Sequence, residues 1–348
     1  MNASDHLMGD LARQIFKDNY AKTPLGASAA ERAELDGELW ATIIESGFET
    51  ALAADEGVTL REAASVLHSA GYYAARVPLA EAMLAHWLAA RAGWSEETAI
   101  PILALGILVP EPVFEGQNVA CRVTGVVEGV PWGRHATAIY VLAGGHIVRL
   151  AVPVARVEHA ENLAGEPRDV VAFEDAAAKR SDQEIDVDEV LARAALLRAA
   201  LMVGAMERAL DLALDHAATR VQFGKPIGKF QAVQQLLAQL GGHVAAAAAA
   251  VDFGADHATA FAAAVAKSRA GEAAGLAAEI AHQIVAAMGF TLEHPLQLVT
   301  RRLWSWRDEC GNETYWNRRI GAATVAAGGD GLWPMLTRAA SIPEATVR

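Results

Sequence analysis

Apolar side chains recur every three or four positions through the first part of the chain. This spacing runs through DHLMGDLARQIF, GELWATIIESGF and TLREAASVLHSAGYYAA. Because it gathers apolar side chains on one face of a helix, residues 1–97 are predicted to form a helical domain. Pro78 opens a further helical stretch, since proline fits the first turn of a helix.

Between residues 98 and 185 the pattern changes to short apolar runs that are rich in β-branched residues. Gly, Pro and Asn separate these runs, which include NVACRVTGVVEGVPW and ATAIYVLAGGHIVRLAVP. Such runs are typical of a small antiparallel β domain. The Gly144-Gly145 pair is expected to form a hairpin turn within it.

The helical period returns at residue 186 and persists. EVLARAALLRAALMVGAMERALDLALDHAA is apolar or alanine around most of its circumference, so this helix is expected to be buried on several sides. Two alanine-rich helical stretches and a last one rich in Arg and Trp follow. The sequence therefore predicts a mainly α fold with a small β domain, divided into residues 1–97, 98–185 and 186–348.

Charge and composition narrow the range of partners. A net charge of −13 over 348 residues argues against a nucleic-acid or anionic-membrane surface, because both need a basic footprint. No stretch reaches about 18 uninterrupted apolar residues, and the acidic N-terminus is unlike a secretory signal. Two cysteines make no disulfide framework, and the histidines lack metal-ligand spacing. We expect a soluble, cytoplasmic protein with no membrane partner and no metal.

One stretch, RVQFGKPIGKFQAVQ at residues 220–234, resembles the helix-turn-helix signature of the acyl-CoA dehydrogenase flavoproteins. Three others resemble that family in the same order along the chain: GELWATIIESGF, RVTGVVEGVPWGRHATAIYVLA and AHQIVAAMGFTLEHPL. The resemblance covers nearly the whole chain. It implies an N-terminal helical domain, a central antiparallel β domain and a C-terminal four-helix bundle that builds a homo- or hetero-oligomer, a dimer or tetramer.

In that family the last helices of one subunit reach the FAD of its neighbour. The resemblance implies that Arg220 binds the diphosphate, for which a permanently charged, forked donor is suited. It places Gln222 on the phosphates or the ribitol and Phe223 as an apolar wall. The other FAD contacts that it implies are Phe230, Gln231 and Gln283. Taken without the other motifs, Arg220 is equally typical of a solvated helix end, and Phe223 of a core residue.

Trp132 has two interpretations. It lies where relatives carry an aromatic residue that lines the flavin, and a ring there would stack on the isoalloxazine. Because Trp132 stands between Pro131 and Gly133, it is also typical of a loop tryptophan packed on the sheet.

Two departures from the family concern the chemistry. Acyl-CoA dehydrogenation needs a carboxylate base, but the family's two base positions fall on Cys310 and Ala195; Glu309, one residue away, is the candidate that remains. The family's long flavin-binding loop is shortened here to GILVPEPVFEGQNVA, which keeps Glu111-Pro112 and lacks Ser-Asp.

Three hypotheses follow from the resemblance. The first is an FAD-dependent acyl-CoA dehydrogenase of fatty acid or steroid catabolism, alone or as one subunit of a heteromeric enzyme, with an acyl-CoA substrate and an electron-transfer acceptor. The second is a non-catalytic subunit that donates half of a flavin site to a partner chain. The third is a flavin monooxygenase on the same fold, which would not need the base.

Overall fold

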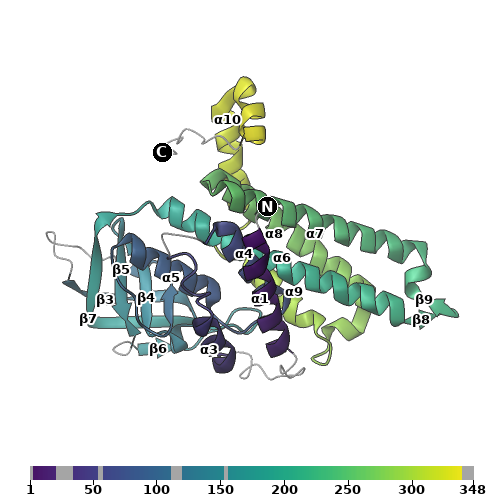
Figure 1. Ribbon diagram of the computed structural model, residues 1–348, viewed down its shortest axis with the longest axis horizontal. Helices are drawn as coiled ribbons and strands as arrows, with labels where there is room; N and C mark the ends of the chain where they lie inside the picture. Colours follow the sequence, from purple (N-terminus) through teal and green to yellow (C-terminus); the bar gives the residue numbers. More distant parts are fainter. Residues whose placement is uncertain (1–2, 21–33, 54–57, 111–119, 153–155, 339–348) are drawn as a thin grey trace. The chain divides into compact units, whose positions relative to one another are not determined.

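The computed structural model describes residues 3–20, 34–53, 58–110, 120–152 and 156–338 (Figure 1). These residues are mainly helical. The α-helices are α1 (Ala3–Tyr20), α3 (Gly37–Glu45), α4 (Leu60–Tyr72), α5 (Leu79–Arg91), α6 (Val187–Thr219), α7 (Gln231–His257), α8 (Ala260–Val285), α9 (Leu296–Asp308) and α10 (Glu313–Arg338). The 3-10 helices are η1 (Gly133–His135), η3 (Ile227–Lys229) and η4 (Ala286–Phe290).

Within the described ranges, nine strands accompany the helices. They are β1 (Pro101–Leu103), β2 (Leu108–Val109), β3 (Ala120–Pro131), β4 (Ala138–Ala143), β5 (His146–Ala151), β6 (Arg156–Glu158), β7 (Arg168–Glu184), β8 (Val221–Gln222) and β9 (Lys225–Pro226). The mainly α fold with a small β domain is thereby confirmed.

The chain forms two compact units. The sheet unit holds α3, α5 and β1–β7, and the helical unit holds α1, α4 and the chain from Ala195 onward. The N-terminal helices are thus shared between the two units, and α6 begins in one and continues in the other. The three-part division of the sequence stays a prediction.

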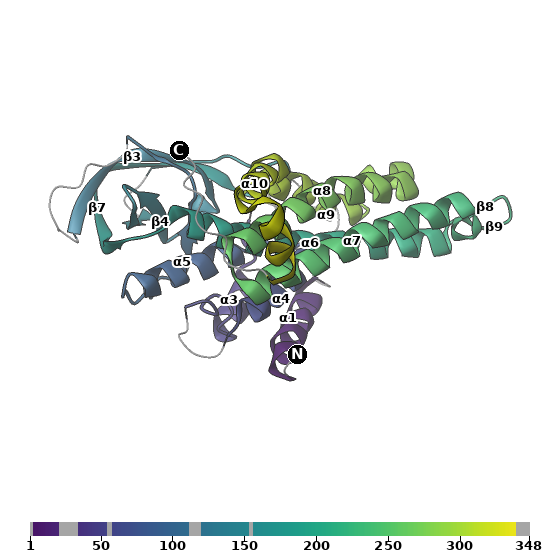
Figure 2. The ribbon, with the colours of Figure 1, turned by 90° about the horizontal axis from the view of Figure 1, so that it is seen from above.

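In the sheet unit, the strands pair in the order β1-β4-β5-β7-β3-β2, with β6 beside β7. The Gly144-Gly145 hairpin is confirmed, because Ala143 pairs with His146 across it and both glycines have positive φ. The pair β1–β4 is parallel, whereas the other strand pairs of this sheet are antiparallel. Figure 2 shows the long strands β3 and β7 curving together. Buried Val, Leu and Phe side chains fill the interior.

In the helical unit, α6, α7, α8 and α9 lie side by side, and α10 packs on α8 (Figure 1). Helix α4 crosses α6 at glycines. A Cβ on Gly71 would lie 2.0 Å from the carbonyl oxygen of Leu201, and one on Gly204 would lie 1.9 Å from that of His68. The two backbones therefore meet without side chains between them.

Two helices, Gln231–His257 and Ala260–Phe290, are long and apolar enough to cross a membrane by length and composition alone. In the second helix, half of the most apolar 18-residue stretch is buried inside the protein, as in the core helix of a bundle. In the first helix, only 22% of the corresponding stretch is buried. Helix α7 therefore exposes an alanine-rich face that carries few charges.

Candidate functional site

The RVQFGK stretch forms a two-residue β-hairpin directly after α6. Gln222 in β8 pairs with Lys225 in β9. Phe223 and Gly224 between them have φ values of 51° and 80°. Two successive residues with positive φ make the type I′ turn that suits the twist of a short hairpin. A bulky residue rarely adopts positive φ. Phe223 adopts it here because it is the first residue of the two-residue turn, and its side chain therefore lies at the tip of the hairpin.

The hairpin presents its side chains to solvent. The Phe223 side chain is 92% exposed, so the interpretation of Phe223 as a core residue is wrong. Arg220 is exposed, and within the described residues no hydrogen bond or ion pair engages its guanidinium. The rings of Phe230 and Phe223 pack edge to face, with centroids 6.1 Å apart. The Lys225 ammonium lies 4.5 Å from the centroid of the Phe230 ring. The hairpin therefore carries an exposed arginine directly before its first strand and an exposed aromatic ring at its tip.

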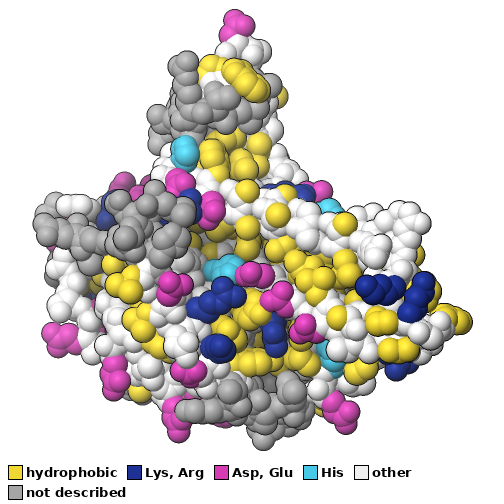
Figure 3. All heavy atoms as spheres, turned by 45° about the vertical axis from the view of Figure 1, so that its right-hand side comes forward, with side chains coloured by type: hydrophobic (Ala, Val, Ile, Leu, Met, Phe, Trp, Pro, Cys, Tyr) yellow, Lys and Arg dark blue, Asp and Glu magenta, His cyan; other side chains and the backbone are white. Residues whose placement is uncertain are grey.

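The other predicted FAD contacts lie at the same end of the bundle. Phe230 caps α7, Gln231 is the first residue of that helix, and Gln283 lies in the last turn of α8. Only two residues join α7 to α8, and the two helices pack along each other, so the end of α8 returns to the start of α7. Figure 2 shows the hairpin at that end, and Figure 3 shows Lys and Arg side chains gathered there.

The candidate base positions lie away from the hairpin, Ala195 on α6 and Glu309 and Cys310 just after α9. Glu309 ends α9, and its Oε2 forms an ion pair with Nη2 of Arg198 at 3.1 Å. Arg198 is buried and lies one turn after Ala195, which is fully buried. The structure thus brings the late base position, Cys310 with its neighbour Glu309, next to the turn that carries the alternative one. The Glu309 carboxylate is held there in a largely buried ion pair.

A buried lysine fixes this loop. Lys267 in α8 is fully buried, and its Nζ donates to the carbonyl oxygens of Arg307 and Gly311, each at 2.8 Å. The Trp316 indole donates to the carbonyl of Cys310 at 3.0 Å. Side chains from α8 and α10 thus satisfy the loop backbone, in which Cys310 and Gly311 both have positive φ. Sequence reasoning missed Lys267, although a lysine between alanines in an alanine-rich helix was a signal for it.

Because of Lys267, the free energy of unfolding should rise with pH in the alkaline range. Burial lowers the pKa of Lys267 to about 8, from the usual 10.5. The unfolded chain therefore binds more protons between these values, and stability rises with pH there, by up to roughly 3 kcal/mol. We expect urea unfolding to show this rise in the wild type and to lose it in Lys267→Met. Equal slopes in the two proteins would contradict the burial of the ammonium.

The two groups of residues are too far apart to serve one cofactor. Arg198 and Arg220 are 22 positions apart along α6, which at 1.5 Å per residue is about 33 Å. That exceeds the length of one extended FAD. A flavin held at the hairpin therefore cannot also reach the base positions of the same chain.

Trp132 lies in the sheet unit and is only 3% exposed. Its backbone has φ 53°, and its ring lies 5.9 Å from that of His135. This burial favours the interpretation as a packed loop tryptophan. The shortened loop with Glu111-Pro112 lies outside the described residues.

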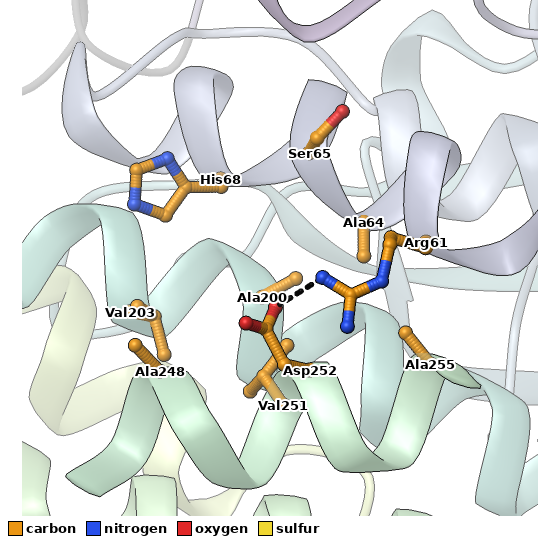
Figure 4. Close-up of a pocket in the computed structure, with 10 residues that line it drawn as sticks. All are labelled: Arg61, Ala64, Ser65, His68, Ala200, Val203, Ala248, Val251, Asp252 and Ala255. Atoms are coloured by element: carbon orange, nitrogen blue, oxygen red, sulfur yellow. Dashed lines mark ion pairs between the residues drawn. The ribbon is translucent and has the colours of Figure 1, made fainter. Parts of the chain in front are cut away.

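A pocket of about 290 Å³ opens between α4, α6 and α7 (Figure 4). Its floor is alanine and valine. Its charged groups are already paired: Arg61 binds Asp252 at 3.2 Å and Asp256 at 2.6 Å, and His68 lies 2.8 Å from Glu207. The charged groups that line this pocket are therefore engaged with one another or with neighbouring side chains. In the described part of the chain, no three His, Cys, Asp or Glu side chains gather to hold a metal ion.

Comparisons with known proteins agree with this architecture. Residues 186–321 match the family described as "Acyl-CoA dehydrogenase, C-terminal domain". No curated protein sequence matches the chain. The chain therefore has the acyl-CoA dehydrogenase fold, and its residues 186–321 are similar to the C-terminal domain of that family.

Solved structures with the same fold include two assemblies of unlike chains. A variant of the Tcur3481-Tcur3483 steroid ACAD has a TM-score of 0.81 and 22% identity, covering 94% of this chain and 99% of that one. The ChsE4-ChsE5 complex of Mycobacterium tuberculosis has a TM-score of 0.76 and 22% sequence identity, and the match covers 94% of this chain and 98% of that one. Butyryl-CoA dehydrogenase of Megasphaera elsdenii has a TM-score of 0.79 and 18% sequence identity, and the match covers 93% of this chain and 99% of that one.

Proposed function

We propose that the chain is a subunit of an FAD-dependent acyl-CoA dehydrogenase and supplies the diphosphate-binding half of a flavin site to another subunit. One observation carries the proposal. The exposed, unpaired Arg220 stands with Gln222 and Phe223 about 33 Å along α6 from the chain's own base positions.

The residues at the hairpin fit FAD. A forked cation suits a diphosphate, and the exposed ring of Phe223 with the half-buried ring of Phe230 suits the flat parts of the cofactor. Helix α7 starts at Phe230 without a side-chain cap, so its first N–H groups are free to favour an anion. Gln231 and Gln283 add amide donors at the same end.

Bound FAD would supply the acceptor for the hydride that leaves the acyl-CoA. The residues of this chain would hold the cofactor: Arg220 neutralises the diphosphate, Gln222 orients it, and Phe223 excludes water from one side. Removal of the proton next to the thioester would fall to a carboxylate of the other subunit, because neither Cys310 nor the buried Ala195 is a carboxylate and Glu309 is paired with Arg198.

An oligomer follows from the proposal and has its own support. The exposed face of α7 is long and alanine-rich, which favours close packing against another helix. Two structures with this fold are assemblies of unlike chains. We propose contact through the C-terminal helices, with an acyl-CoA substrate, a separate electron acceptor and a cytoplasmic location.

A second candidate is a self-sufficient dehydrogenase in which Glu309 is the base. The position of Glu309 beside the turn of Ala195 favours it, since both family base positions meet there. This function requires Glu309 to leave Arg198 when substrate binds.

Flavin content separates the two candidates. The visible absorbance should show almost no flavin in the chain purified alone, and about one flavin for each pair of chains after co-expression with a dehydrogenase subunit encoded beside it. If the lone protein instead carries about one flavin per chain, and an acyl-CoA bleaches it, the donor-subunit proposal is wrong and the self-sufficient enzyme is established.

A further inference from the structure

His282, in the last turn of α8, holds the turn that ends this helix. Its ring stacks on Phe290, with centroids 4.1 Å apart and planes 20° from parallel. Its carbonyl accepts the N–H of Ala286. Ala286 has φ 59° and ψ −146°, a conformation that residues other than glycine rarely adopt. The contacts of His282 therefore keep η4 in a shape that its backbone alone disfavours.

The hydrogen bonds define which ring nitrogen carries the proton. The Thr300 hydroxyl has one hydrogen and donates it to the carbonyl of Leu296 at 3.2 Å. The 2.9 Å contact between His282 Nε2 and Thr300 Oγ1 therefore needs a proton on Nε2. The other nitrogen, Nδ1, is buried and has no hydrogen-bond partner among the described residues. It faces Gly289, where a Cβ would lie 3.1 Å away.

Among the described residues, a second proton on Nδ1 would find no hydrogen-bond acceptor and would be repelled by a second histidine. His294, in the connection before α9, is the titratable group that acts on His282 from outside its own helix, and His216 and Arg208 act on His294 in turn. Burial and this repulsion lower the pKa values of His282 and His294. Glu279, one turn earlier on α8, is exposed to solvent. Two further cations, Arg301 and Arg302, follow Thr300 on α9.

We propose that His282 makes the turn Ala286–Phe290 sensitive to pH: the neutral ring holds the turn, and uptake of a second proton opens it. The imidazolium would carry a buried N–H with no acceptor, beside groups of the same charge. Gln283 is the next residue, so acidification would also weaken the adenylate side of the flavin site. That last consequence rests on the proposed function, whereas the opening of the turn does not.

Amide hydrogen exchange, followed by NMR on the full chain without flavin, tests the opening. The N–H groups of Ala286 and Thr291 are hydrogen-bonded in the closed turn. After correction for intrinsic rates, their protection should fall by several-fold and at most about tenfold between pH 7.5 and 5.5, the limit for one histidine whose pKa in the open turn is about 6.5. In His282→Gln the side-chain amide can still donate to Thr300 but does not titrate, so protection should stay constant over this range.

A matched control and a second measurement complete the test. His257 in α7 also lies against a phenylalanine, Phe253, with ring centroids 4.5 Å apart, and His257→Gln should keep the acid response of the wild type. The opening should share its midpoint with the NMR titration of the His282 ring. Constant protection in the wild type, a loss that persists in His282→Gln, or a midpoint unlike that of His282 would each overturn the proposal. Because no flavin is present, these results do not depend on the proposed function.

Discussion

Replacement of Gly204 by alanine should destabilise the helical unit by at least about 3 kcal/mol. The added Cβ would lie 1.9 Å from the carbonyl oxygen of His68 and 2.8 Å from the backbone nitrogen of Tyr72. Both obstacles are backbone atoms of α4, so no side chain can turn away to make room. The crossing of α4 and α6 would have to widen, which would separate packed atoms along both helices.

The matched control is Gly242→Ala in α7, where nothing lies within 4 Å of the added Cβ. There the substitution should be neutral or stabilise by up to about 1 kcal/mol, because alanine loses less backbone entropy in a helix. Urea unfolding of the two variants makes the comparison. If Gly204→Ala unfolds at the same urea concentration as Gly242→Ala, the close crossing of α4 and α6 is wrong.

Replacement of Arg220 by leucine should weaken flavin binding to the assembled enzyme by about a hundredfold, or roughly 3 kcal/mol. The reason is the loss of a forked, charge-assisted contact to the diphosphate. Arg220→Lys should recover part of the affinity, since lysine keeps the charge but not the fork. Fluorescence titration of the flavin-depleted assembly with FAD measures these affinities.

Two controls distinguish binding from folding. Lys229, exposed in the same connection, has no proposed contact, and Lys229→Ala should stay within about threefold of the wild type. The urea midpoint of Arg220→Leu should match that of the wild type, because within the described residues no hydrogen bond or ion pair engages this guanidinium. Flavin affinity unchanged in Arg220→Leu would remove Arg220 from the site.

Much of the fold could be predicted from local patterns. The three-to-four period placed the helices, and Gly144-Gly145 placed a hairpin, because both signals lie within a few neighbouring residues. The parallel pairing of β1 with β4 could not be predicted in this way, since Ile102 pairs with Ile139 across 37 positions. The close approach of Gly204 to α4 depends in the same way on long-range packing.

In the candidate site, too, local sequence predicted some features, and long-range contacts determined the others. The sequence placed Arg220, Gln222 and Phe223 at a turn, and the structure adds that they are exposed at the tip of a hairpin. Counting along the chain could not show that Glu309 would meet Arg198, because that contact joins α9 to α6 across 111 positions. It also could not show the burial of Trp132, which depends on the packing of the whole sheet unit.

The central claim is that this chain holds the diphosphate and adenine end of a flavin whose isoalloxazine belongs to another subunit. The most direct test is to load the flavin-depleted assembly with FAD that carries a photoreactive azide on adenine, irradiate it and map the labelled peptide. The claim predicts label in residues 220–234 or 283–291 of this chain. Label confined to the subunit that also carries the catalytic carboxylate would contradict it.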